Sequence, residues 1–136
     1  MYSSGKGISP WYASWKALAY ARSVLKDKAY LSLKQAYDSV GAFDELFEIH
    51  ETNILLRPWF TTAAGTFVSA VNELLLQSDG KIIRILPAFP HSQEVSFKLA
   101  AKGGVTVEAK VKNGDLVDVM VIRNGENVTD QFVIEF

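Results

Sequence analysis

The hydrophobic pattern of this chain changes its period once, near the middle. From Ala63 to Leu75 apolar residues recur every three or four positions, as they do on one face of an α-helix. After Ser78-Asp79-Gly80 they occupy every second position, as in a β-strand that buries one face. The two spacings put different residues on the buried face, so a segment with one spacing folds poorly as the other. The chain is therefore predicted to have a helical half followed by a β half.

Two further helices are predicted upstream. The first runs from about Pro10 to Leu25, because Ser9 offers a capping hydroxyl and proline suits the first helical position. The second runs from about Lys28 to Val40, with Asp27 as its cap and Gly41 as its stop. The predicted buried face of this second helix comprises Ala29, Leu33, Ala36, Tyr37 and Val40.

The segment 42–58 loses the helical period and is expected to be a long connection, extended around Ile54 to Leu56. Connections of this length are more often functional than decorative. In the third helix, Gly65 costs about 1 kcal/mol relative to alanine. We therefore expect Gly65 to serve close packing against a neighbour.

About five antiparallel strands are predicted in the β half. Asn113-Gly114 and Asn124-Gly125 are signals for tight turns between them. The strands are expected at 82–86, 95–99, 105–111, 116–122 and 132–136. The predicted fold class is α+β: three helices, then an antiparallel β-sandwich-like domain. The expected division is residues 1–79 and residues 80–136.

Composition excludes several classes of function. A chain of 136 residues with 49% hydrophobic residues can bury a sizeable core. Its net charge of -1 argues against partners such as nucleic acid or an anionic membrane. The absence of cysteine rules out disulfides and thiolate metal sites. No segment is long and apolar enough to span a bilayer, so we expect a soluble chain. Its location is not assigned. If the chain is part of a longer protein, that protein could be secreted or periplasmic.

One segment carries the mixture of side chains that a sugar site uses. Its carboxylates, imidazole, amide, guanidinium and indole belong to Glu48, Glu51, His50, Asn53, Arg57 and Trp59. The polar groups can hydrogen-bond sugar hydroxyls, and an indole can cover the apolar face of the ring. The alternative is a solvated loop with Trp59 in the core. Glu48 and Glu51 are weak candidates for a catalytic acid and base. No metal site or cofactor is predicted, because the only imidazole besides His50 is that of His91, which lies beyond the change from helix to strand.

Two other patterns are open to a functional interpretation. Trp11 and Trp15 lie four residues apart and could stack on a sugar, although aromatic residues with this spacing usually belong to a core. Asn127-Val128-Thr129 matches an N-glycosylation sequon, which matters only in a secreted eukaryotic protein.

Four motifs, in order, resemble the C-terminal region of glycoside hydrolase family 95, the α-L-fucosidase-like enzymes. The segment from Ser14 to Tyr30 is similar to the family's AWKxxxWARLGDGERAY-like helix pair, and 72–80 to its AEMLLQSHDG-like helix end. The segment IRILPAFP at 83–90 is similar to IHLLPALP, and LAAKGGVTVEAKV at 99–111 to LRARGGFEVDIEW. The resemblance covers about Gly7 to Arg123. It implies the last helices of an (α/α)6 barrel followed by the family's β domain, and it points to a bacterial enzyme.

The chain departs from the family at the catalytic position. Members carry a QIDGNFG-like motif, whose aspartate is implicated in the base of an inverting hydrolysis. That aspartate falls on Thr62, whose hydroxyl cannot accept a proton at neutral pH. The family's general acid lies upstream of the matched region.

The resemblance implies the C-terminal portion of a glycoside hydrolase that is not catalytic as an isolated chain. His50, Glu51, Asn53, Arg57 and Trp59 are then expected to bind carbohydrate. The expected protein partner is the missing part of the barrel, or a second copy bound through the helical face. Two alternatives remain: a non-catalytic carbohydrate-binding or assembly module, and a small hydrolase that works through Glu48 and Glu51 alone.

Overall fold

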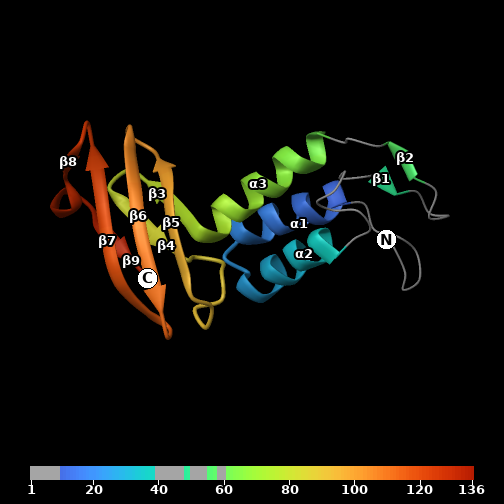
Figure 1. Ribbon diagram of the computed structural model, residues 1–136, viewed down its shortest axis with the longest axis horizontal. Coiled ribbons are helices and arrows are strands. Elements are labelled where there is room, and N and C mark those ends of the chain that lie inside the picture. Colours follow the sequence, from blue (N-terminus) through green and yellow to red (C-terminus); the bar gives the residue numbers. More distant parts are fainter. Residues whose placement is uncertain (1–9, 39–47, 50–54, 58–60) are drawn as a thin grey trace.

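The computed structural model describes residues 10–38, 48–49, 55–57 and 61–136, of which residues 48–49 and 55–57 are described by their backbone. Three helices occupy one part of the molecule and two sheets the other (Figure 1). The helices are α1 (Pro10–Arg22), α2 (Lys26–Asp38) and α3 (Thr61–Leu75). A short hairpin, β1 (Glu48–Ile49) and β2 (Leu55–Arg57), lies at the helical end, away from the sheets.

Alanines bring the three helices close together. The helix α1 packs against both α2 and α3. Its residues Ala13, Ala17 and Ala21 are spaced by four, so they lie on one side of α1, and all three are fully buried. Ala29 of α2 and Ala70 of α3 are also fully buried, and they share one core with Ala17, Ala21 and Leu74. Small side chains at these positions let the helix backbones approach.

The link between α1 and α2 is tighter than expected. Helix α1 ends at Arg22, where the first helix was predicted to reach Leu25. Val24 takes a positive φ of 55°, a conformation in which a helix cannot continue. Helix α2 then begins at Lys26, and the Ala29 amide donates to the Leu25 carbonyl at 2.9 Å. The prediction that Asp27 caps α2 is therefore wrong, because Asp27 lies within its first turn.

The buried face predicted for α2 is largely confirmed. Ala29, Leu33 and Ala36 are buried as expected. Tyr37, however, is 59% exposed, and Val40 and the stop at Gly41 lie outside the described residues.

Apart from the β1–β2 hairpin, the strands of the described residues form two sheets. The first has the order β3-β4-β9 and the second the order β5-β6-β7-β8. The bounds of the first sheet are β3 (Leu76–Asp79), β4 (Ile82–Ile85) and β9 (Val133–Glu135). Those of the second are β5 (Val95–Ala101), β6 (Val105–Lys112), β7 (Asp115–Arg123) and β8 (Glu126–Asn127), which the 3-10 turn η1 (Thr129–Gln131) connects to β9. The α+β layout with a C-terminal sheet region is thus confirmed.

The two sheets contain seven strands where about five were predicted, because β3 and β8 were not expected, and one pairing differs in direction. The segment from Leu76 to Asp79, expected to be the end of a helix, is strand β3, because it pairs antiparallel with β4 from Leu76↔Ile85 to Asp79↔Ile82. Strand β9 runs parallel to β4, with Ile83 opposite Ile134, whereas antiparallel strands were expected. The β3–β4 pairing is a local hairpin, whereas the β4–β9 pairing joins residues that are far apart in the sequence.

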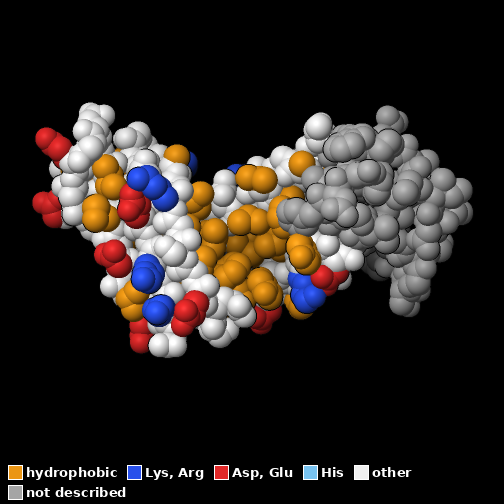
Figure 2. Space-filling model, in the orientation of Figure 1, with side chains coloured by type: hydrophobic (Ala, Val, Ile, Leu, Met, Phe, Trp, Pro, Cys, Tyr) orange, Lys and Arg blue, Asp and Glu red, His pale blue; other side chains and the backbone are white. Residues whose placement is uncertain are grey.

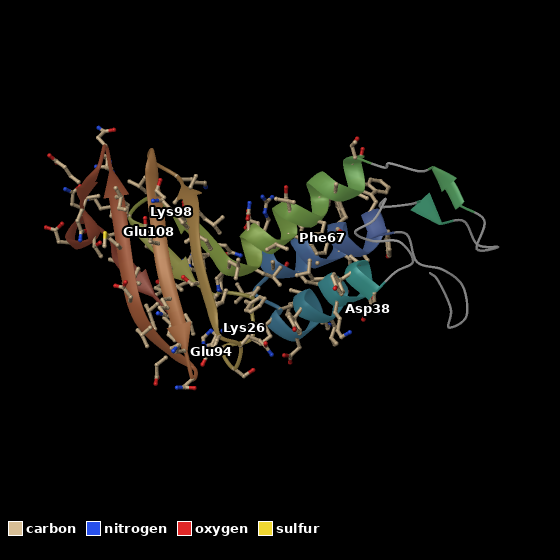
Figure 3. The ribbon with its side chains drawn as sticks, viewed as in Figure 1. Lys26, Asp38, Phe67, Glu94, Lys98 and Glu108 are labelled. Atoms are coloured by element: carbon tan, nitrogen blue, oxygen red, sulfur yellow. The ribbon has the colours of Figure 1, made fainter. Side chains whose placement is uncertain are left out.

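The predicted turns are present. Asn113 and Gly114 have φ values of 52° and 86°, and Asn124 and Gly125 have values of 53° and 87°. Two consecutive positive φ values are what a two-residue hairpin loop requires, and asparagine followed by glycine adopts them at low cost. Across the β5–β6 pair, Lys98 and Glu108 form an ion pair at 2.6 Å (Figure 3).

A single core lies between the two sheets and reaches the end of α3. The first sheet and its flanks contribute Leu75, Leu76, Ile83, Ile85 and Leu86, and the second contributes Val105, Val107, Ala109, Val111, Val121 and Val128. Val71 and Phe89 touch both this core and that of the helices. Phe89 also meets Tyr30 of α2 edge to face, with ring centroids 5.6 Å apart. The division at residue 79 remains a prediction.

Candidate functional site

The predicted sugar-binding segment lies at the helical end of the molecule, and the structure describes part of it. His50, Glu51, Asn53 and Trp59 lie outside the described residues. Of the other two candidates, Glu48 belongs to β1 and Arg57 to β2, and the antiparallel register places them directly opposite each other. Register partners are neighbours across a hairpin, so the backbone places these two sequence positions next to each other. The hairpin lies near α1.

The start of α3 lacks a carboxylate. Helix α3 has no acidic residue in its first turn. Thr62 is exposed there, and its backbone carbonyl accepts a hydrogen bond from the Thr66 hydroxyl at 2.7 Å. A threonine in this place cannot act as a general base. The first turn of α3 can therefore hold or orient a ligand through hydroxyl groups, but it cannot activate water.

The packing role predicted for Gly65 is wrong within the described chain. Gly65 is exposed on α3, and a Cβ at this position would meet no atom within 4 Å. The expectation rested on the helix cost of glycine, which shows that a glycine is unfavourable but does not show what it contacts.

The helices expose large apolar side chains. Trp11 and Trp15 are 39% and 59% exposed, so the expectation that they fill the core is wrong. Figure 2 shows hydrophobic side chains gathered where Figure 1 places α1 and α2, next to the sheets. Other exposed apolar residues of the helices are Tyr12, Leu31, Tyr37 and Val68. An apolar surface of this kind is typical of a face that packs against another protein segment.

A small pocket lies between α2 and α3. Its volume is about 320 Å³, and it is lined by Tyr30, Leu33, Lys34, Tyr37, Asp38 and Phe67. Asp38 lies at the end of α2 nearest the hairpin, and Phe67 lies near the middle of α3 (Figure 3). At the rim, Lys34 donates to the carboxylate of Asp38, and this hydrogen bond raises the pKa of Lys34 above its ordinary value of 10.5. The arrangement suits an apolar ring with a polar edge.

A larger groove, of about 860 Å³, runs between α3, β3 and the end of β5. Several of its polar groups are hydrogen-bonded, either to one another or to residues just outside the groove. Arg22 pairs with Glu73 at 2.9 Å, and the side-chain amide of Gln77 donates to the Ala21 backbone carbonyl at 3.0 Å. The Lys102 amide donates to the Ser78 hydroxyl at 2.9 Å. The groove is thus a polar seam between the helices and the sheets, and sequence reasoning missed it because its residues come from separate segments.

His91 lies on the segment between β4 and β5, and it is not part of the lining of this groove. Its Nε2 is 3.2 Å from Lys26 Nζ and 3.3 Å from the Leu86 carbonyl oxygen, and its ring stacks on Phe136 with centroids 4.4 Å apart. Within the described residues, no group of three histidine, cysteine, aspartate or glutamate side chains is placed to hold a metal ion. The helices of that part of the chain are also too short or too polar to cross a membrane.

Comparison with known proteins supports the family suggested by the motifs. No family model matches the chain. Alpha-L-fucosidase 2 of Arabidopsis thaliana is 31% identical in a comparison over 121 residues, and the match covers 79% of this chain and 14% of the plant protein. A match over 79% of a chain of 136 residues cannot fall within one half, so it includes both helices and strands. The predicted resemblance to the family 95 enzymes is confirmed, and the chain is a partial homologue of the α-L-fucosidase-like glycoside hydrolases.

Proposed function

We propose that this chain is the C-terminal portion of a glycoside hydrolase of the α-L-fucosidase type. The observation that carries the proposal is the 31% identity across helices and strands, over a segment that is 14% of the length of the plant relative. In this proposal α1, α2 and α3 are the last helices of an (α/α)6 barrel, and the two sheets form the β domain that follows. The division then falls near residue 79.

The exposed helical face supports a barrel that continues beyond these helices. Trp11, Trp15, Leu31 and Val68 expose apolar surface that a neighbouring helix would cover. Burying such surface is favourable by roughly 25 cal/mol per Å². The same observation supports the second candidate function, an assembly module whose helical face binds a second copy or another protein.

The proposed sugar site uses the hairpin and its flanks. We assign sugar binding to His50, Glu51, Asn53, Arg57 and Trp59. The register of Glu48 and Arg57 supports this assignment, because it brings together two backbone positions whose residue types can hydrogen-bond sugar hydroxyls. The hairpin lies at the same end of the helices as the start of α3 (Figure 1), where the family motif carries its base.

In the parent enzyme, the proposed reaction is inverting hydrolysis. Such a reaction needs a general acid on the leaving-group side of the sugar and a base for water on the other. Thr62 offers no base, and Glu48 and Glu51 are weak candidates for one. We therefore expect the isolated chain to bind sugar weakly and not to cleave it.

A titration of the purified chain with L-fucose, followed by ligand-observed NMR, tests the binding site. Saturation transfer to the sugar is expected for the wild type and should be lost in Glu51→Ala. Glu126→Ala is the matched control, because Glu126 is an exposed acidic residue of β8, on the sheet part of the molecule. Equal signals from both variants would remove the assignment to this loop.

An activity assay on the same samples tests the catalytic part of the proposal. The chain is incubated with an aryl α-L-fucoside and release of the phenol is measured. No turnover is expected. Turnover by the wild type that disappears in Glu51→Ala would overturn the fragment proposal and favour a small hydrolase that works alone.

A further inference from the structure

We propose that Asn127 is an acceptor site for N-linked glycosylation when the chain passes through a compartment that contains a lipid-linked oligosaccharide and its transferase. Asn127-Val128-Thr129 has the required pattern, with valine rather than proline in the middle. The chain contains no other asparagine with serine or threonine two positions later. The family resemblance pointed to a bacterial enzyme, in which this sequon would have no role. The relative that matches is a plant protein, so a role for the sequon is open.

The fold presents the acceptor residue to solvent. Asn127 is exposed at the end of β8, a two-residue strand at the edge of its sheet. The next residue, Val128, points the other way, into the core between the sheets, and is only 8% exposed. Its amide donates to the Val121 carbonyl at 2.8 Å. The middle residue of the sequon thus anchors the turn, while the asparagine faces outward.

The hydrogen bonds of the sequon engage the oxygen of the asparagine amide. The Thr129 amide donates to Asn127 Oδ1 at 3.0 Å, and the Thr129 hydroxyl donates to the same oxygen at 2.7 Å. Both donors reach Oδ1, on the other branch of the planar amide from Nδ2. Nδ2 is the atom that receives the sugar. The turn therefore holds the threonine hydroxyl against the amide that reacts and directs Nδ2 away from it.

The proposed transfer of the oligosaccharide to Asn127 needs no oxidant or reductant. A bond forms between Nδ2 of Asn127 and the anomeric carbon of the oligosaccharide, and the bond from that carbon to the diphosphate oxygen breaks. The lipid diphosphate leaves with the electron pair, and Nδ2 loses one proton to a base of the transferase.

The position is compatible with the proposed function and independent of it. Strand β8 lies at the far end of the molecule from the β1–β2 hairpin and the exposed helical face (Figure 1). A glycan at Asn127 leaves the sugar site and the barrel interface uncovered. It also shields an edge strand, and edge strands otherwise offer unpaired backbone groups to other chains.

A secretion experiment tests the proposal. The chain is expressed behind a cleavable signal peptide in a eukaryotic cell, and the secreted protein is compared by gel mobility and peptide mass before and after treatment with peptide N-glycosidase. We expect a mobility shift that the treatment removes, with Asn127 converted to aspartate. The shift should disappear in Asn127→Gln. It should persist in Thr129→Ser, which keeps both the sequon and the hydroxyl.

A relocated sequon provides the matched control. The double variant Asn127→Gln with Glu126→Thr moves the sequon to Asn124, in the same exposed turn. A wild-type chain that is secreted without glycan overturns the proposal. If the relocated sequon is then modified, the turn is accessible, and the hydrogen bonds of Asn127 and Thr129 have only a structural role.

Discussion

Gly65 offers the sharpest test of how the helical face behaves in solution. It lies inside α3, is exposed, and has a φ outside the positive range. A Cβ there meets nothing within 4 Å, so Gly65→Ala changes no contact. What remains is helix propensity, which favours alanine by about 1 kcal/mol. We therefore expect Gly65→Ala to raise the free energy of unfolding by about that amount.

The assay is urea unfolding followed by circular dichroism, with a thermal scan on the same samples. For a chain of this size, about 1 kcal/mol corresponds to a rise in Tm of roughly 3–5 °C. Gly80→Ala is the matched control. A Cβ at Gly80 also meets nothing within 4 Å, but its φ is 58°. Alanine is strained in that conformation, so Gly80→Ala should lower stability by about 1 kcal/mol.

A fall in stability for Gly65→Ala would refute the reasoning. It would mean that Gly65 packs closely against a surface that the described chain does not contain. Light scattering on the same variant then separates two causes. Loss of a dimer would identify a second copy as that surface, whereas an unchanged monomer would locate the clash within the chain.

Three further predictions concern the core and the ion pairs. Ile83→Ala truncates a fully buried side chain between the sheets, so we expect the free energy of unfolding, measured with urea, to fall by about 2–4 kcal/mol. Val117 is 53% exposed, so the control Val117→Ala should change it by less than about 0.5 kcal/mol. Glu73→Gln breaks the ion pair with Arg22, whose side chain is 66% exposed while that of Glu73 is 26% exposed, so the loss should stay below about 1 kcal/mol and shrink as salt is added. Asp38 raises the pKa of Lys34 above 10.5, so this pair stabilises the fold below pH 10.5 and the contribution is lost as the pH rises through the higher folded-state pKa. The stability difference between wild type and Asp38→Asn should therefore close on raising the pH beyond that range, and a difference that persists would show that Asp38 acts by another route.

Much of the secondary structure follows from local pattern alone. The change of period after residue 78 separates the helices from most of the strands, and the asparagine-glycine pairs mark both tight turns. These features depend on backbone preferences of a few neighbouring residues. The short strand β3 was not recognised, because it follows α3 directly and only Leu76 of its four residues is apolar. It becomes a strand by pairing with β4.

For the candidate site, tertiary structure supplied more of the information than the local sequence pattern did. Composition singled out the segment from Glu48 to Trp59, but only the register shows that Glu48 and Arg57 are opposite each other. The polar groove along β3 and the contacts of His91 could not be predicted, because they join residues that are far apart in the sequence. Likewise, the sequon was visible in the sequence, but the exposure and hydrogen bonds of Asn127 were not.

The sequence by itself determined that helices precede strands, where the two asparagine-glycine turns lie, that thiol chemistry is absent, and that the chain is similar to the α-L-fucosidase-like enzymes. Only the tertiary structure decided that β9 runs parallel to β4 and that Trp11 and Trp15 are exposed. Periodicity reports which face of an element is apolar, because that is a local property. Which surface covers that face depends on long-range packing, and for α1 much of the apolar face is left uncovered within the described chain.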